Sequence, residues 1–321
     1  MPIPDEGMLP DAEAVAADTA VAYASASIGN VAVGYDVLGC AFPALGDRVR
    51  VRRTDAPGVR IEAITGVVTD LPRDPDRNTA TVALQGLLDE RALPFGLAIS
   101  IEKGIPLGSG MGGSAASAVA AVKAASALLD APLTPEELFR YALAGEAVAS
   151  GAQHGDNVAP SLFGGLVLTR ALDPPDVVPV PVPPGVRCVL VRPHMQIETR
   201  DARRLVPDTV PMATTVQHAA NLAGLVAGCF RGDLALIRRA FEDVLVEPHR
   251  AGLIPGFRAV QAAARAAGAL GCSIAGAGPS VFAWCPDAPT AGDVQAAMVE
   301  AFAGAGLATD AWCAEIGTVG S

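Results

Sequence analysis

The apolar and polar positions of this chain follow two periods, and the period changes repeatedly from one end to the other. Apolar residues at every second position predict strands, and apolar residues three and four positions apart predict helices. Strands are expected near residues 22–26, 48–53, 58–64, 96–102, 187–192 and 309–316, with two more within 272–284. Helices are expected over 79–90, 114–131, 134–151, 213–230, 233–246, 257–270 and 291–303, and another opens at 197–203. This alternation predicts the α/β or α+β class.

Two stretches interrupt the pattern and suggest how the chain is divided. Residues 1–20 are acidic and poor in large apolar side chains, which predicts a loose N-terminal tail without the features of a signal peptide. Residues 173–185 contain too many prolines for a helix or a central strand, so a change of domain is expected there. We therefore expect one domain over 21–172 and a second over 173–321, with the last strand able to pack back on the first domain.

The strongest chemical signal is a glycine-rich loop that leads directly into an alanine-rich helix. The loop lies between Lys103 and Ser114 and has glycine at positions 104, 108, 110, 112 and 113. Glycine lets backbone N–H groups approach a ligand closely, and the first turn of a helix adds unpaired N–H donors and a positive dipole end. Together these features favour a binding site for phosphate or another anion.

Three other interpretations compete for this loop. A plain turn that lets helix and strand pack closely stays open on this stretch alone. A P-loop does not fit, because no Lys-Ser or Lys-Thr follows the last glycine. The spacing from Gly108 to Gly113 does match G-x-G-x-x-G, and Asp130 lies near the distance of a ribose-binding acid. A helix rather than a second strand follows Asp130, however, and this disfavours a nicotinamide dehydrogenase.

Polar side chains gather at two further places. His154, Asp156 and Asn157 fall within four positions, directly after the helix expected over 134–151. Their density beside a glycine-rich region favours a functional site over a histidine satisfied in the core. Asp36 lies in an apolar segment, where a buried carboxylate would need a partner. An Asx-type turn is the alternative explanation for this aspartate.

Composition and charge limit the classes of function. The net charge of -11 argues against non-specific nucleic-acid binding, which needs a basic surface. No apolar run approaches the roughly 18–20 residues of a membrane span, so no membrane partner is expected. The six cysteines include no C-x-x-C pair, which suggests neither a zinc site nor a disulfide scaffold. A cytoplasmic location is expected.

Three ordered stretches make the chain resemble the GHMP kinase superfamily of small-molecule kinases. They are A-S-I-G-N-V-A-V-G-Y-D-V-L-G, I-P-L-G-S-G-M-G-G-S-A-A-S and S-I-A-G-A-G-P-S. Within that superfamily the similarity to homoserine kinases lies in H-G-D-N-V-A-P-S-L-F-G-G and E-P-H-R-A-G-L-I-P-G-F. One departure is Gly113, where the family usually has Ser. The resemblance implies a two-domain α+β GHMP kinase fold, with an N-terminal ribosomal-protein-S5-domain-2-like α/β domain and a C-terminal ferredoxin-like α+β domain.

The resemblance also implies an ATP site around the glycine loop. Ser114 and Glu146 are expected to hold Mg²⁺, which suits a few hard oxygen ligands, and Lys103 is expected to reach the terminal phosphate. The expected ATP-binding residues are Lys103, Pro106, Leu107, Gly108, Ser109, Gly110, Met111, Gly112, Gly113, Ser114 and Ala115.

The same resemblance implies a site for L-homoserine, which carries an ammonium, a carboxylate and a hydroxyl group. Arg203 and Arg250 are matched to the carboxylate and Asp36 to the ammonium. The remaining expected substrate contacts are Asn30, His154, Asn157, Thr199 and Gly278. The expected catalytic residues are Glu146, Asn157, His154 and Asn30. No general base is evident, and positioning with electrostatic stabilisation can act without one.

The implied activity is ATP-dependent phosphorylation of the L-homoserine side-chain hydroxyl to O-phospho-L-homoserine, by a homodimer. Two alternatives stay open. Another GHMP kinase would act on mevalonate, a sugar or shikimate, but these substrates lack the ammonium and carboxylate pair. A catalytically silent nucleotide or amino-acid sensor is the other alternative, since sequence cannot show turnover.

Overall fold

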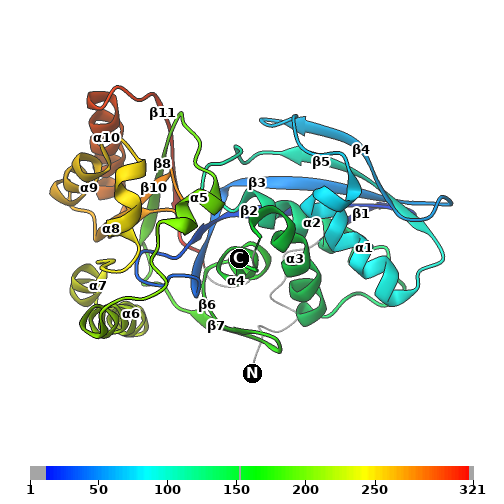
Figure 1. Ribbon diagram of the computed structural model, residues 1–321, viewed down its shortest axis with the longest axis horizontal. Helices are drawn as coiled ribbons and strands as arrows, with labels where there is room; N and C mark the ends of the chain where they lie inside the picture. Colours follow the sequence, from blue (N-terminus) through cyan, green and yellow to red (C-terminus); the bar gives the residue numbers. More distant parts are fainter. Residues whose placement is uncertain (1–11, 152, 318–321) are drawn as a thin grey trace.

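The computed structural model describes residues 12–151 and 153–317, which form a larger and a smaller domain (Figure 1). In these residues the larger domain has a seven-stranded sheet, with the strand order β1-β2-β3-β5-β4 along its main path. Its strands are β1 (Glu13–Ala16), β2 (Thr19–Gly29), β3 (Leu38–Thr54), β4 (Val59–Gly66), β5 (Gly96–Lys103), β6 (Leu166–Leu172) and β7 (Pro175–Val180). The long strand β3 pairs with β2, with β6 near its start and with β5 near its end, and β7 pairs with β6.

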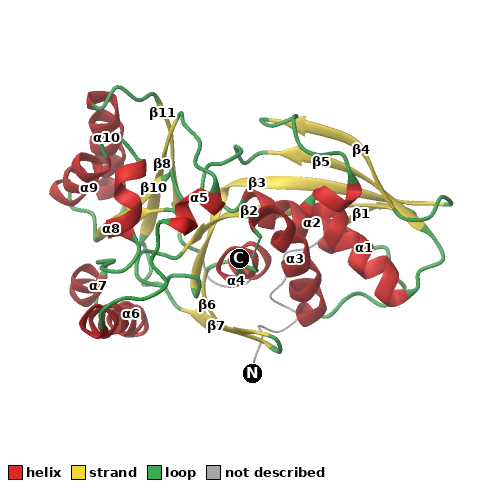
Figure 2. Cartoon of the chain, viewed as in Figure 1, coloured by secondary structure: helices red, strands yellow, loops and turns green. Residues whose placement is uncertain are grey.

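Four helices of the described residues pack beside this sheet (Figure 2). They are α1 (Thr79–Arg91), α2 (Gly113–Ser126), α3 (Pro135–Ser150) and α4 (Gly155–Phe163), and a 3₁₀ turn, η2 (Pro75–Arg77), precedes α1. Every residue of α2 from Ala115 to Ser126 is buried. Because most of these side chains are small, α2 can approach the sheet and the neighbouring helices closely on all sides. This packing fixes the start of α2, where the glycine loop ends.

The smaller domain contains, among the described residues, a four-stranded antiparallel sheet in the order β11-β8-β10-β9. Its strands are β8 (Arg187–Pro193), β9 (Gly271–Ile274), β10 (Val281–Cys285) and β11 (Thr309–Glu315). Its helices are α5 (Thr199–Arg204), α6 (Met212–Arg231), α7 (Leu234–Ala240), α8 (Glu247–Arg250), α9 (Phe257–Ala266) and α10 (Ala288–Gly304), with a 3₁₀ turn, η3 (Ala251–Leu253), after α8. Helical segments follow the first and third strands, as in the expected ferredoxin-like domain. Within the two described ranges, no helix has the length and apolar character to cross a membrane.

The structure corrects two limits of the predicted domains, the end of the N-terminal tail and the boundary at residue 173. Residues 1–11 of the expected tail lie outside the described residues, but β1 already pairs with β2 in an antiparallel hairpin, so residues 13–20 are not a tail. The proline-rich stretch forms β7 at the edge of the larger sheet, where missing N–H donors are tolerated. The expected boundary at residue 173 therefore falls inside the larger sheet. The last strand, β11, pairs with β8, and Ala314 belongs to a hydrophobic cluster that includes buried residues of both domains.

The helix predicted over 233–246 is too long, because α7 ends at Ala240. The carboxylate of Asp243 accepts hydrogen bonds from the backbone N–H groups of Leu245, Val246 and Glu247, at 2.8 to 2.9 Å. Such local side-chain bonds compete with helix continuation. They also set the start of α8, which carries Arg250 to the junction between the domains.

Candidate active site

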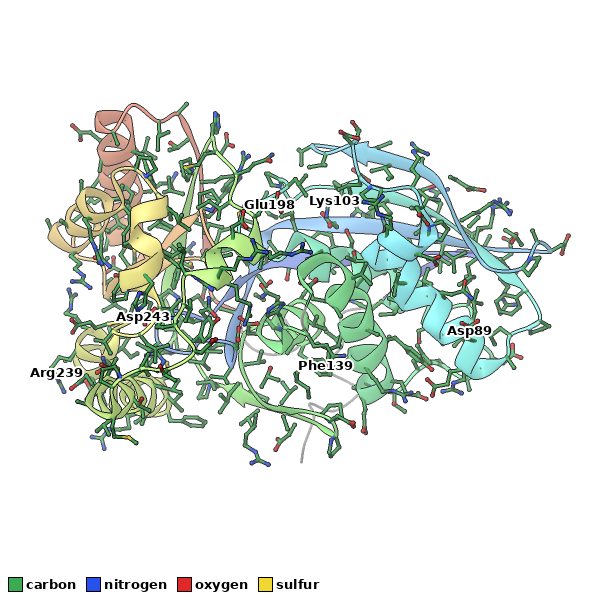
Figure 3. The ribbon with its side chains drawn as sticks, in the orientation of Figure 1. Asp89, Lys103, Phe139, Glu198, Arg239 and Asp243 are labelled. Carbon is green, nitrogen blue, oxygen red and sulfur yellow. The ribbon has the colours of Figure 1, made fainter. Side chains whose placement is uncertain are left out.

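A cavity of about 820 Å³ lies between the two domains, within the size range of small-molecule sites. The larger domain lines it with the loop after β2, the start of α1, the glycine loop and parts of α3 and α4, and the smaller domain with α5 and α8. Figure 3 labels Lys103 and Glu198, which line this cavity from the larger and the smaller domain respectively. All the predicted site residues line it except Ala115, which is fully buried in α2, and Gly278. The roles expected of those two residues stay predictions.

The glycine loop has a shape that only glycine allows at several positions. Gly108, Gly110 and Gly112 have positive φ angles of 59°, 77° and 65°. A Cβ at Gly110 would overlap the carbonyl oxygen of Ala275, and one at Gly112 would overlap the hydroxyl of Ser27. The absence of side chains at these positions therefore lets the loop pack against Ser27 and Ala275 while it lines the cavity ahead of α2, where an anion site is expected.

Gly113, the position that departs from the family pattern, is different. Its φ is not positive, and an added Cβ would lie 3.1 Å from Cγ2 of Ile105. Such a contact is tight but needs a shift of only a few tenths of an ångström. Glycine here is therefore compatible with the loop conformation without being required by it.

Lys103, which is expected to reach the terminal phosphate, lines the cavity, but its ammonium already has protein partners. Its buried ammonium pairs with the Asp47 carboxylate and donates to the carbonyl oxygen of Gly113 at 2.8 Å and to Oγ of Ser117 at 2.9 Å. Asp47 also accepts from Oγ of Ser117 at 2.7 Å and from the backbone N–H groups of Gly104 and Ile105 at 3.1 and 3.2 Å. Through Lys103 and Asp47, both ends of the glycine loop are therefore connected to β3 by polar contacts.

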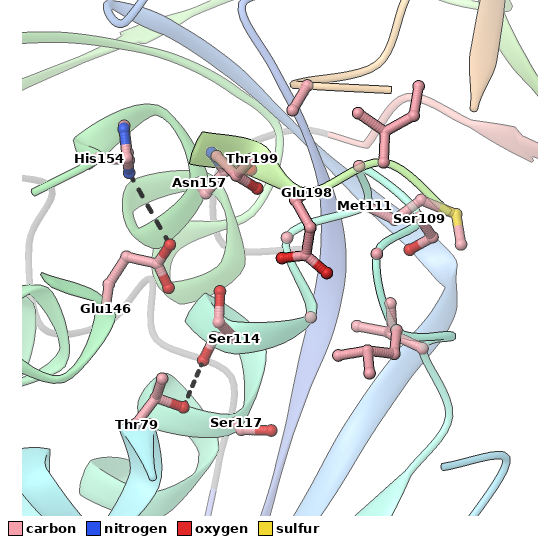
Figure 4. Close-up of a pocket in the computed structure, with 18 of the residues that line it drawn as sticks. Thr79, Ser109, Met111, Ser114, Ser117, Glu146, His154, Asn157, Glu198 and Thr199 are labelled. Carbon is pink, nitrogen blue, oxygen red and sulfur yellow. Dashed lines mark hydrogen bonds and ion pairs between the residues drawn. The ribbon is translucent and has the colours of Figure 1, made fainter. Parts of the chain in front are cut away.

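The residues expected to hold Mg²⁺ line one cavity and offer oxygen donors. Figure 4 shows Ser114, from the first turn of α2, and Glu146, from α3, lining the cavity together with Thr79. Thr79 donates to the carbonyl oxygen of Ser114 at 3.2 Å, and Nδ1 of His154 lies 3.9 Å from the Glu146 carboxylate. No cluster of three or more His, Cys, Asp or Glu side chains suited to a metal occurs in residues 12–151 and 153–317. A few protein oxygens completed by phosphate oxygens and water fit Mg²⁺, so the donor set fits this ion.

The residues matched to the substrate form an ion pair across the cavity. Arg203 of α5 donates from its two terminal nitrogens to the Asp36 carboxylate, at 3.0 and 2.8 Å, and also contacts Nε2 of His154. Asp36 lies in the loop after β2, so this contact joins the two domains. Thr199, the first residue of α5, is exposed and lines the cavity beside them.

Arg250 has a different environment from Arg203. It is only 3% exposed, and its guanidinium donates to the carbonyl oxygens of Ala202 at 3.2 Å and Gly276 at 3.0 Å. Burial lowers the pKa of this guanidinium from its ordinary value. Among the described residues, no carboxylate forms an ion pair with it. A buried cation in this situation favours a bound anion.

Asn30, Asp156 and Asn157 hold the loop after β2 in place. The backbone N–H of Asn30 donates to Asp156 at 3.0 Å, and its side chain donates to the carbonyl oxygen of Gly276 and accepts from the backbone N–H of Asp36. Asn157 accepts from Oγ of Ser27 at 3.0 Å and donates to Asp156 at 3.3 Å. The side chain of Asn30 thus supports the position of Asp36 and is already hydrogen-bonded on both of its polar atoms.

Burial, reinforced by the negative charge of Asp36, raises the pKa of Asp156 to about 6. This carboxyl group is 2% exposed and lines the cavity. Because its oxygens accept from Asn30 and Asn157, it serves the loop structure directly. Its contacts do not identify it as a base.

Comparisons with known proteins agree with this geometry. The family model described as "GHMP kinases N terminal domain" matches residues 78–165, and "GHMP kinases C terminal" matches residues 225–304. The fold also resembles the crystal structure of L. major mevalonate kinase in complex with R-mevalonate, with a TM-score of 0.71 at 16% identity, which shows the fold alone. The two domains, and the glycine loop that lines the cavity between them, are those of a GHMP kinase.

More similar relatives narrow the class. The homoserine kinase of Xylella fastidiosa (strain 9a5c) is 51% identical over 93% of this chain and 91% of its own length. That of Chlorobium phaeobacteroides is 45% identical over 87% and 91% respectively. The crystal structure of homoserine kinase from Cytophaga hutchinsonii superimposes with a TM-score of 0.91 at 40% identity, covering 96% of this chain and 98% of that chain. The chain belongs to the homoserine kinase family.

Proposed function

We propose that this protein transfers the terminal phosphoryl group of ATP to the side-chain hydroxyl of L-homoserine, giving O-phospho-L-homoserine in threonine biosynthesis. The observation that carries the assignment is the buried guanidinium of Arg250, which lines the same cavity as the glycine loop. It has no carboxylate partner within the described residues, and the carboxylate of an amino-acid substrate supplies one. A sugar or an unsubstituted alcohol would leave this charge uncompensated.

The amino-acid end of the substrate has a matching set of groups. Arg203 and Arg250 are assigned to the carboxylate, and Asp36 is assigned to the ammonium. Before substrate binds, Arg203 and Asp36 neutralise each other, and a zwitterion offers each of them a new partner. His154, Asn157 and Thr199 line the cavity together with these groups and the glycine loop, which supports a role in orienting the hydroxyl.

The glycine loop and the start of α2 are assigned to the phosphates of ATP, where backbone N–H groups and the helix dipole stabilise negative charge. Ser114 and Glu146 are assigned to Mg²⁺, with Thr79 supporting Ser114 through its carbonyl oxygen. When bound, the ion neutralises charge on the phosphate oxygens. Lys103 is assigned a supporting role, because its contacts with Asp47 and Gly113 hold the loop in the conformation that directs these N–H groups toward the phosphates.

Transfer then depends on placing the hydroxyl in line with the terminal phosphate and stabilising the charge that develops there. The residues assigned to the substrate fix its two charged groups, which leaves the hydroxyl arm to extend toward the loop. We assign no general base. Of the two buried carboxylates that line the cavity in the described residues, Glu146 is assigned to Mg²⁺ and Asp156 is engaged by Asn30 and Asn157.

We also propose that the protein is a homodimer formed through α6. This helix carries no Asp, Glu, Lys or Arg from Met212 to Phe230, and the side chains of Met212, Val216 and Phe230 are 75%, 62% and 59% exposed. The exposed apolar face of α6 can pair with its copy in a second chain about a twofold axis, and no like charges then lie opposite each other. This holds although each chain has a net charge of -11. Sedimentation should give a dimer for the wild type and a monomer for Val216→Glu, whereas a monomeric wild type would overturn the proposal.

We also propose that the protein is located in the cytoplasm. All six cysteines are free thiols in the structure, and reducing compartments keep cysteines in that form. Fractionation of cells that produce the protein tests this assignment.

The experiment that tests the activity is identification of the product by ³¹P NMR. A reaction with ATP, Mg²⁺ and L-homoserine should give a phosphomonoester signal split by the two protons of the adjacent CH₂ group. That splitting places the phosphate on the side-chain oxygen. A phosphorus signal without it would mean attachment at the carboxylate or the amine, and would contradict the assignment.

A further inference from the structure

Tyr35 contacts both of the arginines assigned to the substrate carboxylate, although they come from different helices. The guanidinium carbon of Arg203, in α5, lies 5.5 Å from the centre of the Tyr35 ring. The guanidinium carbon of Arg250, in α8, lies 5.4 Å from the same centre. Both distances are within the range at which a cation is attracted to the electron-rich face of an aromatic ring. The tyrosine is half-buried and lines the cavity.

The ring solves an electrostatic problem that this pair of arginines creates. The two guanidinium groups repel each other although Arg203 is paired with Asp36, and burial adds a desolvation cost for Arg250. A carboxylate beside Arg250 would remove both costs, but it would also neutralise the charge needed for the substrate. An aromatic face attracts a guanidinium without neutralising it. Arg250 therefore keeps its full charge for a ligand.

Hydrogen bonds hold the backbone around Tyr35, so the ring has a fixed place in the larger domain against which the two arginines can pack. Gly34 donates its N–H to the carbonyl oxygen of Asn30 at 2.7 Å, and Leu38 donates to the carbonyl oxygen of Gly34 at 2.8 Å. The next residue, Asp36, donates its N–H to the side chain of Asn30 at 3.1 Å. These hydrogen bonds therefore hold the residues before and after Tyr35 in the chain. The ring is thus held by the larger domain, while both arginines come from the smaller domain.

We propose that Tyr35 is a positioning residue that sets the selectivity for a substrate carboxylate, by holding Arg203 and Arg250 toward it while Arg250 keeps no carboxylate partner of its own. This inference rests on the proposed function and adds a residue to it. The ring, and not the phenol hydroxyl, carries the role. Substitution should therefore affect the amino-acid substrate and leave the nucleotide site unchanged.

The test is steady-state kinetics of the full chain with Tyr35→Phe and Tyr35→Leu, varying homoserine and ATP separately. Tyr35→Leu removes the aromatic face, and the KM for homoserine should rise about tenfold, while the KM for ATP changes by less than about twofold. Tyr35→Phe keeps the face, so both KM values should stay within about twofold of the wild type. Tyr23→Leu removes a tyrosine that does not line the cavity, and it should match the wild type.

Three results would overturn the inference while leaving the proposed function in place. One is an unchanged KM for homoserine in Tyr35→Leu. Another is a Tyr35→Phe variant as impaired as Tyr35→Leu, which would assign the role to the hydroxyl. The third is an equal rise of both KM values with a lowered melting temperature, which would indicate a general structural role. A wild type that does not phosphorylate homoserine would instead contradict the proposed function and this inference with it.

Discussion

Arg203 donates two hydrogen bonds to the carboxylate of Asp36, at 3.0 and 2.8 Å, and so joins the smaller domain to the larger one across the cavity. Each residue thereby satisfies a charge that would otherwise face the cavity alone. An amino-acid zwitterion carries the same two charges, so it can replace each residue as the partner of the other. We infer that this ion pair is a preformed site for an ammonium and a carboxylate.

Arg203→Ala and Asp36→Asn should each raise the KM for homoserine by about tenfold or more, because a hydrogen bond to a charged group contributes roughly 1.5–3 kcal/mol. The KM for ATP should change little. In the double variant the two effects should not add, since the residues contact each other. The control is Arg204→Ala, which changes the neighbouring exposed arginine paired with Asp201. Equal losses toward ATP and homoserine would contradict this view of the pair.

Glu146→Gln should lower kcat more than Asp156→Asn does. Glu146 lines the cavity with Ser114 and is assigned to Mg²⁺, whereas the oxygens of Asp156 accept from Asn30 and Asn157, and an amide can keep part of that arrangement. The loss in Glu146→Gln should be partly offset by a higher Mg²⁺ concentration. Rates of ADP release at several Mg²⁺ concentrations measure this, and the reverse order of the two variants would contradict the assignment.

Asp156 should make the stability of the protein fall as the pH rises. Its pKa is raised to about 6 in the folded protein, above the ordinary value of 3.8, so the folded state holds this proton more tightly than the unfolded chain. The stabilising contribution is complete below the ordinary pKa and is lost as the pH rises through about 6. Relative to Asp156→Asn, the wild type should lose about 1 kcal/mol of unfolding free energy between about pH 5 and about pH 7.5. Urea unfolding at both pH values tests this, and a constant difference between the two proteins would refute it.

Asp47→Asn should damage both stability and ATP binding. It leaves the buried ammonium of Lys103 without its carboxylate, and breaking a buried ion pair costs about 3–5 kcal/mol. Since Asp47 also accepts from Gly104 and Ile105, the KM for ATP should rise more than the KM for homoserine. Adding Lys103→Met removes the uncompensated charge and should restore part of the stability. If Asp47→Asn unfolds in urea like the wild type, Asp47 does not hold the loop.

The glycine loop could be predicted from the sequence because its signal is local. The spacing of Gly108, Gly110 and Gly112 ahead of an alanine-rich helix already implies an open backbone at a helix start, and all three have positive φ in the structure. The fold class followed from periodicity and from the resemblance to GHMP kinases, and the comparisons bear it out. Element ends were less predictable, since α7 ends early through the side-chain bonds of Asp243.

The tertiary contacts of several site residues could not be predicted from the sequence. Lys103 lies beside the glycine loop in the sequence, but its ammonium turns toward Asp47, 56 positions away. One signal could have found Asp47: it occupies the same face of β3 as the buried residues Val49 and Val51, so its carboxylate had to meet a buried partner. Tyr35 gave no such signal, because its role depends on two arginines that come together only in the folded chain.

The most direct test of the central claim is ADP release from ATP and Mg²⁺ by the wild-type chain, with L-homoserine, mevalonate, shikimate, galactose or no acceptor. We predict a rate that depends on homoserine and is lost in Arg250→Ala, because only this acceptor supplies both an ammonium and a carboxylate to the cavity. A comparable rate with galactose, which has neither charged group, would contradict the carboxylate site. A comparable rate with mevalonate, which has a carboxylate but no ammonium, would contradict the ammonium site, and both results would keep the phosphate loop. ATP binding without turnover on any acceptor would contradict the kinase activity itself.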